Sequence, residues 1–470
     1  MVFSSLIFLL LFLPIFLIGY HLVEKRYKNS FALLFSLLFY FWGAPNFILI
    51  AIGSIIVDYY LVAFISRFKA RNRLVMLWVS IVFNLSFLLY YKYFNFFIEN
   101  LNIVLEGGHT YDIAAIILPI GISFFTFQKI SYSVDIYRKT APPLKSLLDY
   151  SLYIMLFPQL IAGPIVRYNE IADQLNNREF RNYNDRIYGL YRFAIGLAKK
   201  AIIANVLGEK ADLIFGLESV DLNSSVAWLG IICYTFQIYF DFSGYSDMAI
   251  GLGRMMGFKF PENFNSPYIS QSITEFWKRW HITLGSWMRD YLYIPLGGNR
   301  VSSKVRLYSN LWLVFLISGL WHGASWNFVL WGAYHGLFLI FDRLFLNTLT
   351  KGIGKLGRVM ITFLVVLFGW VLFRTENLTA AVDYYSALLS FDFQNIYLFV
   401  SAKFYRVLSV ALIMSFLLFS DRIKNMYSRF VDSGAFQNQI IKSVFALFLI
   451  TICVANLAGS GFNPFIYFRF

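Results

Sequence analysis

One histidine, His322, interrupts an otherwise apolar stretch of the sequence, SGLWHGASWNFVLWGAYHG (318–336). An ionisable side chain in such a stretch costs free energy, and by default it marks a functional site or a water-lined cavity. Burial favours the uncharged imidazole, which is the form that a general base needs. The alternative is a histidine that only hydrogen-bonds to a neighbouring helix. For His335, near the far end of the same stretch, a packing role is the favoured interpretation.

A second histidine, His281, lies in a segment of mixed polarity, SQSITEFWKRWHITLGSWMRDYLYIPLGGNR (270–300). Ser272 followed by Glu275 has the spacing of a capping box and predicts that a helix begins there. That helix places His281 on the apolar face that also carries Trp277, Leu284 and Met288, so it is amphipathic and suits a membrane interface. The competing interpretation is a histidine that is satisfied within an aromatic cluster.

Two carboxylates, Asp241 and Asp247, lie in QIYFDFSGYSD (237–247) at the end of an apolar run. They could line a polar cavity, orient a histidine, or cap the next helix near Ser243. Residues six apart on a helix do not face each other, so a paired acid–base dyad requires the chain to bend at Gly244. Gln237 and Asn327 are further candidates for lining a cavity.

The elements that must position these residues are membrane helices. Hydrophobic residues make up 59% of the 470 residues and charged residues only 14%, whereas soluble domains carry about 25% charged residues. Apolar runs long enough to cross a bilayer recur along the whole chain. They lie near residues 2–22, 31–43, 46–66, 75–96, 113–134, 149–166, 187–206, 225–242, 307–321, 326–342, 358–374, 405–420 and 440–457. We therefore predict an all-α polytopic membrane protein with about ten to twelve crossings, some of them re-entrant or interfacial, in a single domain over 1–470.

Charge and breaks within the runs refine this prediction. The net charge of +14 is explained by Lys and Arg in short cytoplasmic loops, such as RFKARNR (67–73), and this distribution predicts an extracytoplasmic N-terminus. LPIGISFFTFQ (118–128) and FPQLIAGP (157–164) contain Pro and Gly, and they are either walls of an internal cavity or ordinary kinked helices. Three GxxxG spacings, beginning at Gly253, Gly319 and Gly332, indicate close helix packing.

Several chemistries find no support in the sequence. It contains no GxSxG, GxxxxGK[ST], HExxH or GxGxxG motif, and its two cysteines form no CxxC pair. No metal site is therefore expected. A transporter or flippase of lipid-linked sugars suits the multi-pass topology and the broken helices, but no inverted repeat is visible.

Long motifs together resemble the membrane-bound O-acyltransferase family, within it the bacterial alginate O-acetyltransferase branch. The matching segments are QIYFDFSGYSDMAIGLGRMMGFKFPENFNSPY (237–268), FWKRWHITLGSWMRDYLYIPLGGNR (276–300), GLWHGASWNFVLWGAYHG (319–336) and FGWVLFR (368–374). The likeness covers nearly the whole chain, and the motif-rich core spans about 115–375. The teichoic-acid D-alanyl-transferring branch is a close cousin that shares the later histidine region.

The resemblance implies a ring of transmembrane helices around a central funnel. It also implies that His322 is the catalytic histidine and that His281 is a second histidine needed for activity. An acetyl group would pass from cytoplasmic acetyl-CoA, a substrate and not a resident cofactor, to an exported polysaccharide. The transfer would use an extracytoplasmic partner of the SGNH-hydrolase type. Arg279, Arg289 and Arg300 are candidates for holding the CoA phosphates, and the expected location is the bacterial inner membrane. Teichoic-acid D-alanyl transfer and peptidoglycan acyl transfer remain alternatives.

Overall fold

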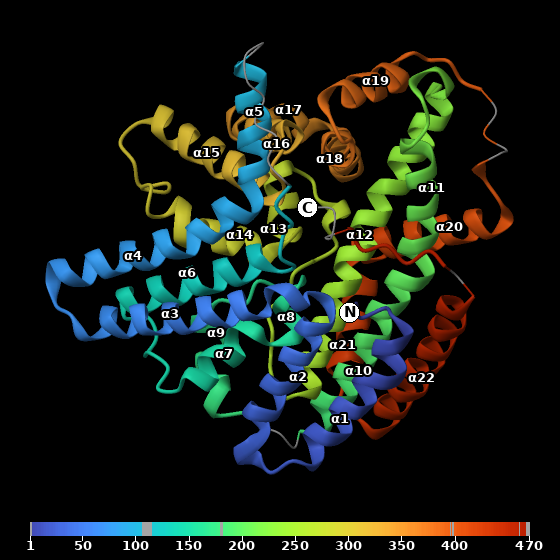
Figure 1. The fold of residues 1–470 in the computed structure, drawn as a ribbon. Coiled ribbons are helices and arrows are strands. Elements are labelled where there is room, and N and C mark those ends of the chain that lie inside the picture. The colour runs from blue at the N-terminus through green and yellow to red at the C-terminus, as the bar shows by residue number, and fades with distance from the viewer. Residues whose placement is uncertain are drawn as a thin grey trace. The chain divides into compact units, whose positions relative to one another are not determined.

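The computed structural model describes residues 2–105, 115–178, 182–394, 396, 399–459 and 461–466. The structure is 80% helical, and the described residues contain no strand (Figure 1). This confirms the predicted all-α polytopic class. The chain forms two compact units, the first comprising Met1–Arg186 with Leu252–Pro261 and the second Ile187–Gly251 with Glu262–Phe470. Whether these two units belong to one domain, as the sequence predicts, is not tested by this division.

Five helical segments in the described residues are long and apolar enough to cross a membrane. They are Pro45–Arg67, Arg71–Val104, Ser224–Met255, Trp326–Arg374 and Phe436–Ala458. A bent pair, Ala402–Phe416 with Asp421–Asp432, brings the number to six if it forms one span, and Phe8–Leu22 is a shorter apolar helix. Each of these segments overlaps a predicted apolar run. The remaining crossings of the predicted ten to twelve stay predictions.

The first unit is built from short and medium-length helices. They are α1 (Leu13–Leu22), α2 (Lys28–Gly43), α3 (Ile48–Arg67), α4 (Ala70–Leu88), α5 (Phe94–Val104), α6 (Ile122–Arg138), α7 (Leu147–Met155), α8 (Phe157–Leu160), α9 (Tyr168–Asn176) and the start of α10 (Tyr183–Ala198). Helices α3, α4 and α6 lie side by side (Figure 1). Between them the fully buried Asp58 accepts hydrogen bonds from Ser80 (2.9 Å) and Asn84 (2.6 Å). The Ser80 hydroxyl also lies 2.7 Å from the Ser133 hydroxyl of α6. Buried polar groups in a bilayer need such partners, so this network ties the three helices together.

The Pro and Gly breaks of the first unit pack against each other. Helix α6 begins at Ile122, later than the predicted run 113–134, because Gly121 adopts a left-handed φ of 79°. A Cβ atom on Gly121 would lie 2.6 Å from the carbonyl oxygen of Leu160, so only glycine allows this approach. The second broken run accordingly divides into α7 and α8 at Leu156. The two broken runs contact each other directly at this point.

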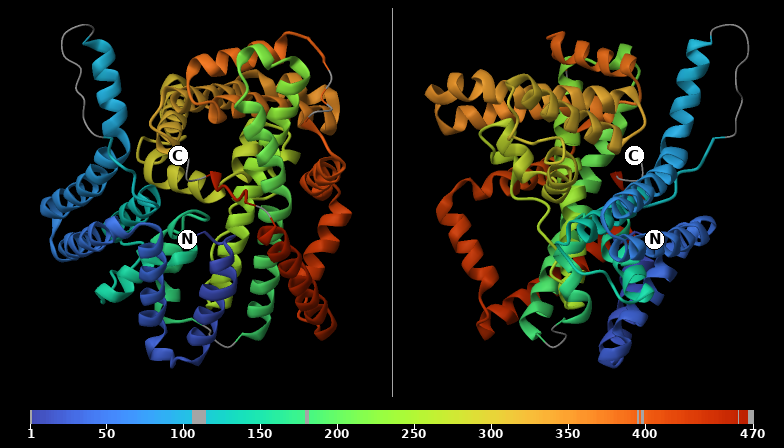
Figure 2. Two further views of the ribbon diagram at one scale, coloured as in Figure 1. Left: turned by 45° about the vertical axis from the view of Figure 1, so that its right-hand side comes forward. Right: turned by 90° about the vertical axis from the view of Figure 1, so that its left-hand side faces the viewer.

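The second unit holds three of the five long apolar segments and most of the predicted chemistry. Its helices are the end of α10, α11 (Asn205–Phe215), most of α12 (Ser224–Met255), α13 (Ile273–Arg279), α14 (Ile282–Met288), α15 (Lys304–His322), α16 (Trp326–Phe341), α17 (Asn347–Leu349), α18 (Gly354–Arg374), α19 (Leu378–Leu389), α20 (Ala402–Phe416), α21 (Asp421–Asp432) and α22 (Phe436–Ala458). Figure 2 shows α15, α16 and α18 as a layer of yellow to orange helices.

Glycines bring α15 and α16 into close contact. A Cβ atom on Gly319 would lie 2.2 Å from the carbonyl oxygen of Phe328, and one on Gly332 would lie 2.4 Å from that of Phe315. Two backbones approach this closely only where no side chain intervenes. The close helix packing predicted from the GxxxG spacings at Gly319 and Gly332 is confirmed, and it holds the turn after His322 in a fixed position. At Gly253 the nearest atoms to a Cβ would instead be those of the Phe260 ring, outside any helix.

Candidate functional site

His322 is the last residue of α15, directly before the turn into α16. Its side chain is buried, with an exposed fraction of 6%. The imidazole ring makes edge-to-face contacts with Trp331 and Phe373, at centroid distances of 5.2 and 5.1 Å. The helix hairpin thus places the predicted histidine inside an aromatic cluster, where water is largely excluded.

A small cavity adjoins His322. It has a volume of about 10 Å³ and an almost entirely apolar lining, contributed by α12, α13–α14, α15, α16, α18 and the C-terminal segment. The lining residues are Ile238, Phe242, Trp280, His322, Trp331, Trp370, Phe373 and Ile466. A volume of this size holds about one water-sized sphere. Among the described residues, His322 is the one ionisable side chain in this lining, and the walls around it are apolar.

His281 lies between α13 and α14, which corrects the predicted continuous helix. The helix begins as predicted, because the Ser272 hydroxyl accepts a hydrogen bond from the N–H of Glu275 (3.1 Å). It ends at Arg279, and His281 takes a left-handed conformation with φ 44°. Such a backbone is uncommon outside glycine and marks a constrained position. The break turns His281 toward His322, and their ring centroids lie 6.5 Å apart.

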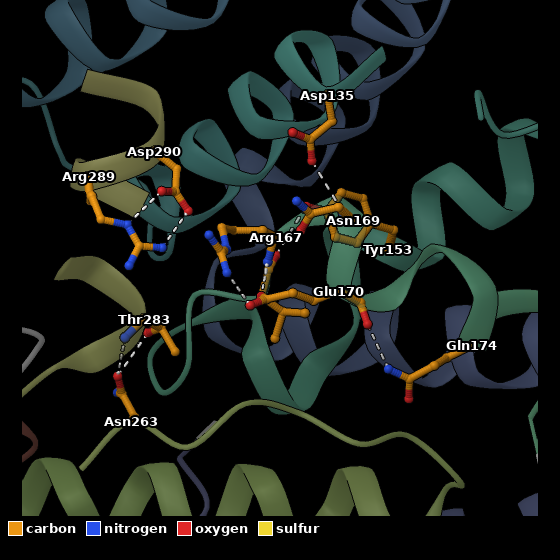
Figure 3. A network of polar contacts seen from close by, with 11 residues as sticks. Asp135, Tyr153, Arg167, Asn169, Glu170, Gln174, Asn263, Thr283, Arg289 and Asp290 are labelled. Atoms are coloured by element: carbon orange, nitrogen blue, oxygen red, sulfur yellow. Dashed lines mark hydrogen bonds and ion pairs between the residues drawn. The ribbon is translucent and has the colours of Figure 1, made fainter. Parts of the chain in front are cut away.

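Asn263 determines the orientation and tautomer of His281. Its side-chain oxygen lies 3.0 Å from His281 Nδ1. The same oxygen accepts hydrogen bonds from the Thr283 hydroxyl (2.8 Å) and N–H (3.3 Å), and Figure 3 shows Asn263 beside Thr283. Because an amide oxygen only accepts, Nδ1 must carry the proton and Nε2 the lone pair. Burial first, and the neighbouring His322 second, hold the pKa of His281 well below its ordinary value of 6.5. His281 is therefore a neutral imidazole with a defined basic nitrogen.

The carboxylates of α12 do not line this cavity. Helix α12 continues through Ser243 and Gly244, so no new helix begins near Ser243 for these carboxylates to cap, and the bend that an acid–base dyad would require does not occur. Asp241 forms an ion pair with Lys200 (2.7 Å), and Asp247 forms ion pairs with Arg192 and Lys199, each at 2.7 Å. Both carboxylates are nearly fully buried, so their role is to hold neighbouring segments to α12.

The other predicted cavity residues are also absent from the lining. Asn327 donates hydrogen bonds to the carbonyl and hydroxyl oxygens of Thr375 (2.8 and 3.0 Å), which join the start of α16 to the end of α18. Gln237 is buried on α12, where its side chain packs against Gly208 of α11. Neither residue contributes to the cavity beside His322.

The three candidate arginines differ in their charge balance. Arg279 forms an ion pair with Glu275 (2.8 Å). Arg289 forms one with the adjacent Asp290 (2.7 Å), as Figure 3 shows. Arg300 is exposed and forms no ion pair with the described residues. Of the three, Arg300 is therefore the one whose charge is available to an anionic ligand.

His335 is fully buried among aromatic rings, with Trp277 and Trp331 at centroid distances of 4.9 and 5.1 Å. It lies outside the lining of the cavity, which fits the packing role favoured for it. Sequence reasoning missed Asn263, the aromatic walls and Ile466. Asn263 and the aromatic residues do lie within the quoted motifs, but a motif does not say which of its members meet in space.

Comparison with known proteins assigns the chain to one family. Residues 138–373 match the model of the membrane-bound O-acyltransferase (MBOAT) family. The chain belongs to this family and is an acyltransferase.

Relatives are similar over most of their length. The chain is 47% identical to a probable alginate O-acetylase AlgI of Pseudomonas aeruginosa, covering 83% of this chain and 75% of that protein. It is 39% identical to the probable alginate O-acetylase AlgI of Pseudomonas putida over the full length of both. It is 38% identical to a peptidoglycan O-acetyltransferase of Helicobacter pylori, covering 81% of this chain and 78% of that protein.

Proposed function

We propose that this protein is an O-acetyltransferase that carries an acetyl group from cytoplasmic acetyl-CoA across the membrane toward an exported polysaccharide. The main support for this proposal is the position of His322, which lies buried beside an aromatic cavity with the His281 ring at a centroid distance of 6.5 Å. The chain also belongs to the MBOAT family. The relatives named as alginate O-acetylases support acetyl as the acyl group and alginate or a similar polysaccharide as the acceptor.

In the proposed reaction, His322 acts as the general base. It takes the proton of an incoming hydroxyl, whose oxygen attacks the carbonyl carbon of the acetyl thioester. The new C–O bond forms as the C–S bond breaks, and the proton passes from His322 to the departing CoA thiolate. General-base assistance of this kind contributes about 10²–10⁴-fold in rate. This step requires His322 to start as the neutral imidazole.

The hydroxyl comes from a serine of an extracytoplasmic partner of the SGNH-hydrolase type, which then passes the acetyl group to the polysaccharide. The proposed setting is the bacterial inner membrane, with the N-terminus outside. Arg300 is the preferred candidate for the CoA phosphates, because Arg279 and Arg289 already carry carboxylate partners. Arginine binds phosphate oxygens in a forked geometry.

The test compares His322→Ala with the matched control His335→Phe, which alters a buried histidine of the same helix pair outside the cavity lining. Both variants are purified, reconstituted in vesicles and supplied with acetyl-CoA, the partner and the polysaccharide. We expect His322→Ala to lower acetyl transfer by at least about 10²-fold, whereas the control retains it. Normal acetylation by membrane-inserted His322→Ala would refute the proposal.

Peptidoglycan is the second candidate acceptor, favoured by the similarity to the Helicobacter pylori peptidoglycan O-acetyltransferase. Parallel assays with alginate, peptidoglycan fragments and teichoic acid separate the acceptors, and a D-alanyl thioester replaces acetyl-CoA in the last of them. A transporter would instead move sugar across the vesicle membrane without consuming CoA thioester.

A further inference from the structure

The last described residues return from the end of α22 to the interior of the second unit. After α22 ends at Ala458, residues 461–466 run back beside α12, as the red trace in Figures 1 and 2 shows. Phe465 stacks on Tyr245 of α12 at a centroid distance of 4.7 Å, and Phe465 and Ile466 are both buried. A non-helical segment inside a membrane protein needs partners for its backbone groups. Two charged side chains supply them.

Asp241 and Lys200 hold this segment as a clamp. Asp241 accepts a hydrogen bond from the N–H of Ile466 (2.9 Å), and Lys200 donates one to the carbonyl oxygen of Pro464. The two side chains also form an ion pair with each other, and their exposed fractions are only 2% and 4%. Removing two charges from water is costly, so their mutual attraction alone is a weak reason for the pair to exist. The Asp241–Lys200 pair instead serves to fix the backbone on both sides of residue 465.

The segment held in this way completes the cavity beside His322. Ile466 forms one wall, facing the aromatic residues of α16 and α18. The cavity is about 10 Å³, so a single methyl group beyond a carbonyl approaches the limit that its walls allow. A longer acyl chain requires a wall to move. Apart from Trp280, the other lining residues lie on helices, whereas Ile466 is held in place by the side chains of Asp241 and Lys200.

We propose that the cavity receives the methyl end of the acyl group, and that Ile466, positioned by the Asp241–Lys200 clamp, restricts the acyl group to two carbons. The inference rests on the proposed acyl transfer at His322. It goes further because it names Ile466 as the residue that limits the length of the acyl chain, and Asp241 and Lys200 as the side chains that position it. One methylene in an apolar pocket changes selectivity by about 10–200-fold.

The first test measures transfer from acetyl-CoA, propionyl-CoA and butyryl-CoA in the reconstituted system. We expect Ile466→Ala to raise the propionyl-to-acetyl rate ratio by at least about tenfold, and Lys200→Met to raise it in the same direction. The matched control is Ile231→Ala, which alters a buried isoleucine of α12 outside the cavity lining. The control should leave the ratio unchanged. An unchanged ratio in Ile466→Ala, with acetyl transfer measurable, would overturn the proposal.

A second test examines the clamp without any acyl transfer, so that failure of the proposed function stays distinguishable. Ile466→Cys is introduced with Cys233→Ser and Cys453→Ser, which replace the two native cysteines, both buried. The new thiol is then labelled with a membrane-permeant maleimide. We expect slow labelling in the protein with the intact clamp and at least about tenfold faster labelling when Lys200→Met is added, because a locally opened segment exposes the thiol. Equal labelling rates would show that the clamp does not hold the wall.

Discussion

Removing the side chain of Asn263 should disable His281 without touching the cavity itself. Asn263 is fully buried, and its side-chain oxygen serves one imidazole N–H and two donors of Thr283. In Asn263→Ala the Thr283 hydroxyl can rotate to another acceptor, but His281 Nδ1–H and the Thr283 N–H cannot. Each unsatisfied buried donor costs about 1–3 kcal/mol, so the free energy of unfolding should fall by about 2–6 kcal/mol.

The catalytic consequence follows from the tautomer. Without its acceptor, Nδ1 no longer retains the proton preferentially, and Nε2 is no longer the defined basic nitrogen. We expect acyl transfer to fall by about 10²-fold, to the level of His281→Ala. If Asn263 acts through His281, the double variant is no slower than His281→Ala alone. A double variant in which the two losses multiply would refute this reasoning.

Asn263→Asp supplies the matched variant, because it keeps an acceptor oxygen and adds a negative charge. A carboxylate beside Nδ1 favours the imidazolium, so it raises the pKa of His281 from its lowered value. In the wild type, His281 therefore stays neutral when the pH falls to 6.5 and somewhat below. In Asn263→Asp, His281 gains its proton at a higher pH than in the wild type. As the pH falls, we expect Asn263→Asp to lose activity at a higher pH than the wild type does. Coincident pH–rate profiles for the two proteins would contradict the assigned role.

Three further outcomes are expected. Gly319→Ala should disrupt the α15–α16 hairpin and abolish acyl transfer, because the new Cβ would lie 2.2 Å from the Phe328 carbonyl oxygen. Gly53→Ala in α3 is the control, since its Cβ would meet nothing within 4 Å and the variant should be tolerated. Thermal unfolding in detergent and the acyl-transfer rate are measured for both variants. Asp247→Asn removes the carboxylate that the partly buried Arg192 and Lys199 share, and because Arg192 keeps its ion pair with Glu262, the free energy of unfolding should fall by only about 1–3 kcal/mol in the same assay. Arg300→Ala should raise the KM for acetyl-CoA and leave kcat little changed, because losing a phosphate contact weakens binding of the ground state and of the transition state equally. A change confined to kcat would count against phosphate binding by Arg300.

The class of protein and the main candidate residue follow from local sequence. Few charges and recurrent apolar runs require a bilayer around the chain, and the structure has the corresponding long apolar helices. His322 can be recognised in the sequence as an ionisable residue between two apolar segments, and the spacing of the glycines in α15 and α16 predicts that these helices pack closely. Ser272 caps its helix as predicted, because a cap depends on residues only three positions apart. Each of these inferences uses neighbours along the chain.

Only the tertiary structure decided what surrounds the two histidines. The helical periodicity around His281 predicted a continuous helix, but hydrogen bonds to Asn263, 18 positions earlier, stabilise a left-handed break instead. Asp241 looked like a helix cap or a cavity residue, yet it binds the N–H of Ile466, 225 positions away. Periodicity and capping rules describe neighbours within a few residues. Burial of a charge is compensated by whichever partner the folded chain brings to it, and that partner is chosen by packing over the whole unit.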